Sequence, residues 1–153
     1  MPAPHVPWPR FDRLAYLLLL DDQRRLLLCG GCCGRWTVPQ VRVDVGADFR
    51  DAAAKFLLEQ LNERNPRFGS VYGMRESTQE ESWEFDRATT SRALIFHVSD
   101  EQGDRFENNS PSHTRWGVGD LRRRRREITP EGLVLLVTGY VEGWIPDGPI
   151  SLP

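Results

Sequence analysis

Lysine is almost absent from this sequence of 153 residues, because one Lys, Lys55, accompanies nineteen arginines. Acidic residues balance the arginines, and the net charge of -2 gives the protein as a whole no electrostatic affinity for nucleic acid or an anionic membrane. The longest apolar run, residues 15–20, is far shorter than the ~20 residues that cross a bilayer. The Pro-rich start contains no apolar leader. We therefore expect a cytoplasmic protein with no membrane partner.

Signature motifs of several enzyme classes are missing as well. The sequence contains neither the GxSxG elbow of α/β-hydrolases nor the phosphate-cradling GxxxxGK[ST] loop. The cysteines cluster in CGGCCG, but the histidines are scattered without the paired spacing that structural zinc requires. We expect small residues in a Gly-rich connection here, and neither zinc nor a Cys–His nucleophilic pair. These residues are Cys29, Cys32, Cys33, His5, His97 and His113.

Apolar patterns in the first half predict an α/β order. Residues 14–20 and 24–29 are apolar runs around a short polar turn, which predicts a pair of strands. Residues 41–45 alternate between Val and polar residues, as a half-buried strand does. Asp48 is placed to cap a helix that ends near Leu61. The apolar stripe of this helix consists of Phe49, Ala53, Phe56, Leu57 and Leu61.

The second half predicts two further strands and a closing helix. The strands are expected at residues 70–75 and 93–99, joined by a polar connection. A loop over residues 100–113 should follow. Thr129-Pro130 is placed to cap and begin the last helix. The whole chain is predicted to be one domain, with an extended arm over residues 1–12 and an irregular tail over residues 143–153.

The segment around the first helix resembles the Nudix family. Trp36-x-x-Pro39, Gly46, Ala52-Ala53-x-Lys55 and Glu59 follow the frame of the Nudix box, written GX5EX7REUXEEXGU with U a bulky aliphatic residue. The order of the predicted elements is also similar. The resemblance implies a Nudix-type α/β/α sandwich, in which a mixed β-sheet lies between the box helix and the C-terminal helix. It further implies a small-molecule phosphorylated ligand and a homodimer.

The sequence departs from the box at most of its acidic positions. Val41 stands at the opening Gly, Ala47 at the first Glu, Phe56 at the Glu after Arg, and Gln60 at the last Glu. Of the four box glutamates, Glu59 alone remains. The resemblance implies Mg²⁺ or Mn²⁺ as cofactor, and such hard cations need several oxygen ligands held together. We therefore expect only weak binding of either cation.

The resemblance assigns candidate roles residue by residue. Glu59 and Lys55, which stands at the Arg position of the box, are the catalytic candidates. The weak candidate metal ligands are Glu59, Gln60 and Asp44. The ligand-binding candidates are Trp36, Arg42, Asp44, Arg122 and Arg123.

Acids outside the box leave an alternative open. Asp48 and Asp51 share a helical face with Lys55 and Glu59, where they could supply ligands or simply form solvated acid–base pairs. The polar connection between the later strands offers a second source of acid, or is merely a solvated loop. Its acids are Glu80, Glu81 and Glu84.

Five consecutive arginines, Arg122 to Arg126, are the strongest charge feature. Guanidinium groups bind phosphate in bidentate fashion, so the run could contact RNA or clamp a substrate phosphate. Interleaved aromatics and a nucleic-acid fold signature are missing, which favours a solvated or packing role over nucleic acid.

Three functions remain open from the sequence. The favoured one is a Nudix-like protein that binds a nucleotide or phosphorylated small molecule, or runs a repurposed reaction, without metal-dependent pyrophosphate hydrolysis. The second is a working hydrolase that uses acids outside the box on a nucleoside-diphosphate-linked substrate. The third is a protein or RNA interaction module built on the arginine run.

Overall fold

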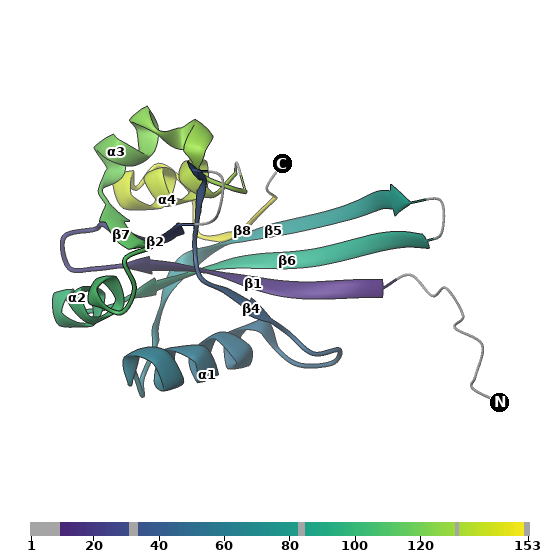
Figure 1. Ribbon diagram of the computed structural model, residues 1–153, viewed down its shortest axis with the longest axis horizontal. Helices are drawn as coiled ribbons and strands as arrows, with labels where there is room; N and C mark the ends of the chain where they lie inside the picture. Colours follow the sequence, from purple (N-terminus) through teal and green to yellow (C-terminus); the bar gives the residue numbers. More distant parts are fainter. Residues whose placement is uncertain (1–9, 31–33, 83–84, 131, 152–153) are drawn as a thin grey trace.

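The computed structural model describes residues 10–30, 34–82, 85–130 and 132–151 (Figure 1). The described strands form one mixed sheet in the order β3-β2-β1-β6-β5-β8, with β4 beside β1 and β7 beside β2. The strands are β1 (Arg10–Leu20), β2 (Leu26–Gly30), β3 (Trp36–Thr37), β4 (Gln40–Arg42), β5 (Arg67–Ser82), β6 (Phe85–His97), β7 (His113–Trp116) and β8 (Gly148–Ser151). The helices are α1 (Phe49–Leu61), α2 (Asp100–Asn108), α3 (Val118–Arg123), the 3-10 helix η2 (Arg125–Glu127) and α4 (Gly132–Glu142).

Strand β1 organises two hydrophobic cores on opposite faces of the sheet. It runs parallel to β6 over its whole length, with Leu17 opposite Leu94. Successive side chains of a strand point to opposite faces. Leu17 and Leu19 therefore pack with α1 and α2, whereas Leu18 and Leu20 pack with α3 and α4. Figure 1 shows the same two layers around the sheet. The predicted α/β/α sandwich is confirmed.

Helix α1 forms where the sequence predicts it. The Asp48 carboxylate caps it by accepting a hydrogen bond from the Arg50 amide at 2.7 Å, and Asn62 ends it in the left-handed conformation. Ala53, Leu57 and Leu61 are buried against the sheet, while Phe49 and Phe56 are half-buried. The helix lies between β4 and β5 in the chain, which is the place that the resemblance gave to the box helix.

Two predictions about strands were wrong. The strand over residues 41–45 ends at Arg42, because the chain turns through a hydrogen bond from the Ala47 amide to the Asp44 oxygen and leaves Val45 86% exposed. The expected connection over residues 76–92 is instead a continuation of β5 and β6. Its backbone groups pair across the hairpin, for example between Glu76 and Thr90, so its polar composition did not prevent strand formation.

Two predictions about helices also need correction. Residues 100–108 form α2 and not a loop, because Ser99 and Gln102 make a capping box. The last helix begins at Gly132 and not at Pro130. The reason is that Thr129 is tied to β3: its amide donates to the Trp36 oxygen at 2.9 Å, and its own oxygen accepts from the Thr37 hydroxyl.

The two ends of the chain contain more regular structure than expected. Strand β1 begins at Arg10, so part of the predicted arm belongs to the sheet, and residues 1–9 lie outside the described residues. Part of the predicted irregular tail forms β8, which pairs in parallel with β5. Across the described ranges, none of the helices is both long enough and apolar enough to traverse a membrane.

Candidate functional site

Three of the predicted site residues lie on the outer face of α1, where they are exposed to solvent. Lys55, Glu59 and Gln60 are exposed, and Phe56 turns partly inward against the core beneath α1. Lys55 forms no ion pair with Asp51 or with any other described residue. This face is therefore an open helical surface, where each polar group interacts chiefly with water.

A pocket of about 450 Å³ lies at the N-terminal end of α1. Its walls come from β1, the turn before α1, the first residues of α1, and β6. Three arginines, one aspartate and three apolar residues line it, and the guanidinium of one of these arginines, Arg50, stacks on the Phe68 ring at 5.1 Å. The lining residues are Arg13, Gly46, Ala47, Asp48, Phe49, Arg50, Arg92 and Leu94, and we call this the α1 pocket.

The strand register explains why arginines converge there. Arg92 lies opposite Ala15 across the β1–β6 pair, which makes Arg13 its diagonal neighbour on the α1 face of the sheet. Both guanidinium groups stack on the Phe49 ring, at 4.5 Å for Arg13 and 5.2 Å for Arg92. The Arg13 Nη1 also donates to the Asp44 oxygen at 2.6 Å. These contacts hold the two cations side by side.

The charges of the α1 pocket are left without acidic partners. In the described part of the chain, no carboxylate forms an ion pair with Arg13, Arg50 or Arg92. The Asp48 carboxylate caps α1, and the positive end of the α1 dipole points to the same place. An anion entering this pocket would meet an excess of positive charge.

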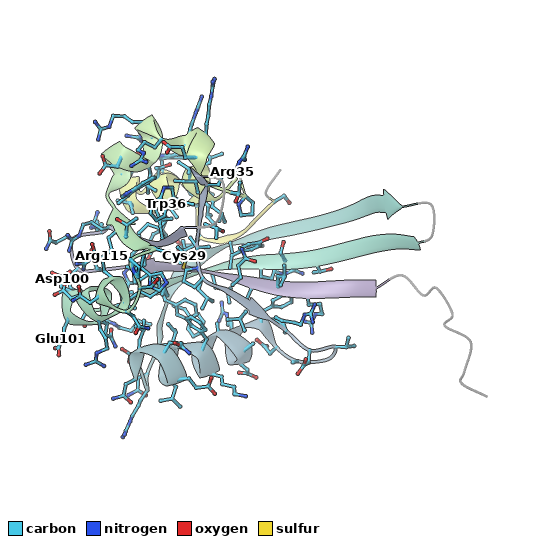
Figure 2. The ribbon with its side chains drawn as sticks, viewed as in Figure 1. Cys29, Arg35, Trp36, Asp100, Glu101 and Arg115 are labelled. Carbon is cyan, nitrogen blue, oxygen red and sulfur yellow. The ribbon has the colours of Figure 1, made fainter. Side chains whose placement is uncertain are left out.

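The remaining predicted ligand-binding residues do not join this pocket. Trp36 packs into the core beneath α4, with its ring 5.4 Å from that of Trp116. Figure 2 shows Trp36 on the side of the sheet that carries α3 and α4. Arg122 pairs with Glu142 and Arg123 pairs with Asp120 on that same side. The predicted ligand set is thus divided between the two faces of the sheet.

Asp44 and Arg42 lie nearer to α1 than the other ligand-binding candidates. Arg42 is an exposed residue at the end of β4. Asp44 is exposed in the turn that leads to α1, where its backbone oxygen, rather than its carboxylate, contacts Arg13. The acids of the predicted connection belong to the β5–β6 hairpin, which extends beyond α1 (Figure 1). Glu80 lies opposite Asp86 in the strand register near the end of this hairpin, and Glu84 lies outside the described residues.

The cysteine and histidine candidates have structural explanations where the structure describes them. Burial raises the pKa of the Cys29 thiol to about 11, so this thiol stays protonated and is a poor nucleophile. The His113 Nδ1 lies 2.7 Å from the Phe106 oxygen, and the His97 Nε2 lies 2.7 Å from the Tyr140 hydroxyl. Cys32 and Cys33 fall outside the described residues, as does His5.

His97 gives a prediction about pH. Burial lowers its pKa from the ordinary 6.5, and the positive charges of Arg67 and Arg24 lower it further. Neutral His97 therefore favours the folded state above pH 6.5, and this contribution is lost as the pH falls from 6.5 toward the lower folded pKa. An NMR titration, with the signal assigned by its loss in His97→Gln, should give a midpoint below 6.5. A midpoint at or above that value would contradict the environment described here.

Among the comparisons with known proteins, those with solved structures agree on one fold. No family model and no curated protein matches the sequence. A mutT/nudix family protein from Listeria innocua shares the structure with a TM-score of 0.61 at 12% identity, over 90% of this chain and 95% of that one. A C. elegans Ap4A hydrolase shares the structure with a TM-score of 0.58 at 13% identity, over 86% of this chain and 98% of that one. A NUDIX family hydrolase from Clostridium perfringens has a TM-score of 0.54 at 8% identity, over 87% of this chain and 97% of that one. The chain has the Nudix fold. Identities this low establish the fold and not the activity.

A Nudix fold raises the question of a divalent cation. The positions on α1 that the resemblance assigns to the Arg and the glutamates of the box hold Lys55, Phe56, Glu59 and Gln60, which offer one carboxylate and one amide oxygen. Mg²⁺ and Mn²⁺ prefer several oxygen ligands, mostly carboxylates. Among the described residues, no three His, Cys, Asp or Glu side chains come together in a way that could hold a metal ion. These donors do not fit either cation.

Sequence reasoning missed the arginines that form the α1 pocket. Arg13, Arg50 and Arg92 are far apart in the chain and match no motif. The parallel pairing of β1 with β6 brings Arg13 and Arg92 together, and such long-range pairing cannot be derived from local patterns. A partial signal was present at Arg92, which interrupts the otherwise uncharged stretch of residues 88–96, but Arg13 follows Asp12 and has no such signal.

Proposed function

We propose that this protein uses the α1 pocket to bind a phosphorylated small molecule of the nucleoside-diphosphate type, and that it does so without metal-dependent hydrolysis. The observation that carries the proposal is that three arginines line one pocket, two of them stacked on the same Phe49 ring, and that none of the three has an acidic partner among the described residues. Arginine suits this role because its planar fork donates two parallel hydrogen bonds to phosphate oxygens.

The size and composition of the pocket support this ligand class. Small-molecule pockets usually enclose about 300–1,000 Å³, a range that includes the α1 pocket. The half-buried Phe49 offers an apolar contact beside the cations, so that a ligand with both a diphosphate and a less polar group would find partners for each. Two structural neighbours are named as hydrolases, one of them of Ap4A, and the ligand class is carried over from them as part of this proposal.

The absence of hydrolysis is inferred from the donors on α1. Family hydrolases hold their cations with box glutamates, as the resemblance implies, whereas this helix offers Glu59 alone. The neutral Gln60 amide and the Phe56 ring cannot replace two carboxylates, since Mg²⁺ loses its water only for strong oxygen donors. A repurposed role as a phosphate-binding domain is consistent with the exposure of Glu59, which forms no ion pair with any residue that the structure describes.

Substitution of two arginines of the α1 pocket should weaken the binding of ADP. Calorimetric titration with ADP, in buffer containing a chelator, should show binding to the native protein. The double variant Arg13→Gln with Arg92→Gln should bind roughly 30-fold more weakly, since two partly solvated phosphate contacts contribute about 1 kcal/mol each.

A matched control removes the same charge elsewhere. Arg64→Gln with Arg123→Gln changes two exposed arginines outside the α1 pocket, and it should bind ADP like the native protein. Circular dichroism would verify that both double variants are folded. Equal weakening in the two would show that ADP responds only to the overall charge, and no change in Arg13→Gln with Arg92→Gln would reject the pocket.

A further inference from the structure

A second pocket, of about 680 Å³, lies on the opposite side of the sheet from the α1 pocket. It is formed where α3 and η2 face α4, and part of the arginine run lines it. The lining residues are Arg122, Arg125, Arg126, Gly132, Val134, Leu135, Thr138 and Trp144, and we call this the α4 pocket. The role proposed for the α1 pocket does not account for it.

The arginine run is largely neutralised, and two members stand apart. Arg122 pairs with Glu142 and Arg123 with Asp120. Arg124 pairs with Glu127 at 2.8 Å and stacks on the Trp116 ring at 4.0 Å. Arg125 and Arg126 have no carboxylate partner among the residues that the structure describes, and both line the α4 pocket. The pocket therefore carries an excess of positive charge.

The other wall of the α4 pocket is apolar and open to solvent. Leu135 is 57% exposed and Trp144 is 54% exposed, although both are large apolar side chains. Thr138 adds no free donor, because its hydroxyl donates to the Val134 oxygen at 2.8 Å. Solvated apolar surface of this kind, beside unpaired cations, is typical of a binding site rather than of an inert surface.

The indole of Trp144 is held in place. Gly143, at a φ of +77°, turns the chain after α4, and the Trp144 amide donates back to the Gly139 oxygen at 3.1 Å. Its Nε1 donates to the Glu142 carboxylate at 3.1 Å, and the same carboxylate holds Arg122. The absence of a side chain at Gly139 permits this arrangement, since a Cβ there would clash with the Ile145 side chain and press on the Trp144 ring. The Trp144 part of the apolar wall is thus fixed by its own contacts before any ligand arrives.

We propose that the α4 pocket binds an amphipathic organic anion. Arg125 and Arg126 hold its carboxylate, phosphate or sulfonate group, and Leu135 and Trp144 cover its apolar body. The volume is suitable for a small molecule. A single-stranded nucleic acid fits less well, because it needs successive aromatic platforms, and Trp144 is the one exposed aromatic side chain in this lining.

The test uses anilinonaphthalene sulfonate, which combines an anionic group with an apolar body and fluoresces when bound. The native protein should show saturable binding of one molecule. Arg125→Gln with Arg126→Gln should weaken it at least tenfold, and Leu135→Ser should weaken it severalfold, because Leu135 is exposed and its loss spares the core. The control Arg64→Gln with Arg123→Gln should bind like the native protein. Near-UV circular dichroism would verify native packing, since this dye also binds loosely packed states.

Competition separates the ligand classes. Decanoate should displace the dye, whereas inorganic sulfate at the same concentration should not. The proposal is rejected if sulfate competes as well as decanoate, if a single-stranded oligonucleotide competes better, or if Arg125→Gln with Arg126→Gln binds the dye like the native protein. The variant Arg13→Gln with Arg92→Gln should leave dye binding unchanged, so that this proposal and the one for the α1 pocket can fail separately.

Discussion

Replacing Asp21 with alanine should lower the free energy of unfolding by about 3 kcal/mol, the lower end of what removal of a partner from a buried ion pair costs. The Asp21 side chain is 0% exposed. Its carboxylate accepts from the Gln23 and Arg25 amides at 3.0 and 2.9 Å, and from the Arg25 and Arg115 guanidinium groups at 2.8 and 3.2 Å. The variant therefore loses both the β1–β2 turn contacts and a buried charge pair.

Asp104→Ala is the matched control for this prediction. Asp104 pairs with the same Arg115, at 2.5 Å, but its side chain is 61% exposed. Its loss should change stability by about 1 kcal/mol or less, as is usual for exposed pairs. Urea unfolding of both variants measures the two effects. Equal losses would mean that burial of Asp21 does not determine its contribution.

The double variant Phe56→Glu with Gln60→Glu should gain about a hundredfold in Mg²⁺ affinity. Residues 56, 59 and 60 lie three and four apart on α1, so the change places three carboxylates on one helical face. At ~4 Å and in a water-like dielectric, each added carboxylate attracts a divalent ion by about 2 kcal/mol, and mutual repulsion offsets part of the sum. Stability should fall by about 2 kcal/mol, because Phe56 is a half-buried aromatic residue.

Phe56→Gln provides the control, since glutamine has nearly the shape of glutamate without its charge. It should lose similar stability and gain no Mg²⁺ affinity in calorimetry. A folded double variant that binds Mg²⁺ no better than Phe56→Gln would contradict the placement of the Nudix box on α1. Such a result would also remove the reason for treating Phe56 and Gln60 as lost ligands.

Local sequence patterns were sufficient to predict strand β1, the turn after it and helix α1. The apolar run of β1, the turn after it, and the cap and apolar stripe of α1 were all visible in the sequence, and the resemblance arranged them into the correct sandwich. Helix α2 was missed although Ser99 and Gln102 form a capping box, because the polar composition of residues 100–108 suggested a loop. The polar hairpin was missed for a related reason: its strands are defined by backbone pairing, to which side-chain polarity gives little guidance.

The candidate sites depended on contacts that the sequence does not reveal. The arginine run drew attention through its charge, but only the structure shows that Arg122, Arg123 and Arg124 are paired, while Arg125 and Arg126 have no carboxylate partner in the part of the chain that it describes. Conversely, Arg13 and Arg92 were inconspicuous until the pairing of β1 with β6 placed them around one aromatic ring. The sequence shows which residues are charged, whereas only the fold shows which of these charges are paired.

The most direct test of the central claim is a titration of the native protein with ADP, done once with Mg²⁺ and once with a chelator, followed by analysis of the nucleotide. We predict binding in both conditions, no tighter with Mg²⁺ than with the chelator because Mg²⁺ itself occupies phosphate oxygens, and intact ADP at the end, since the guanidinium groups of the α1 pocket bind the phosphates without a cation. Binding that requires Mg²⁺, or release of AMP only when Mg²⁺ is present, would contradict this prediction and identify a working hydrolase.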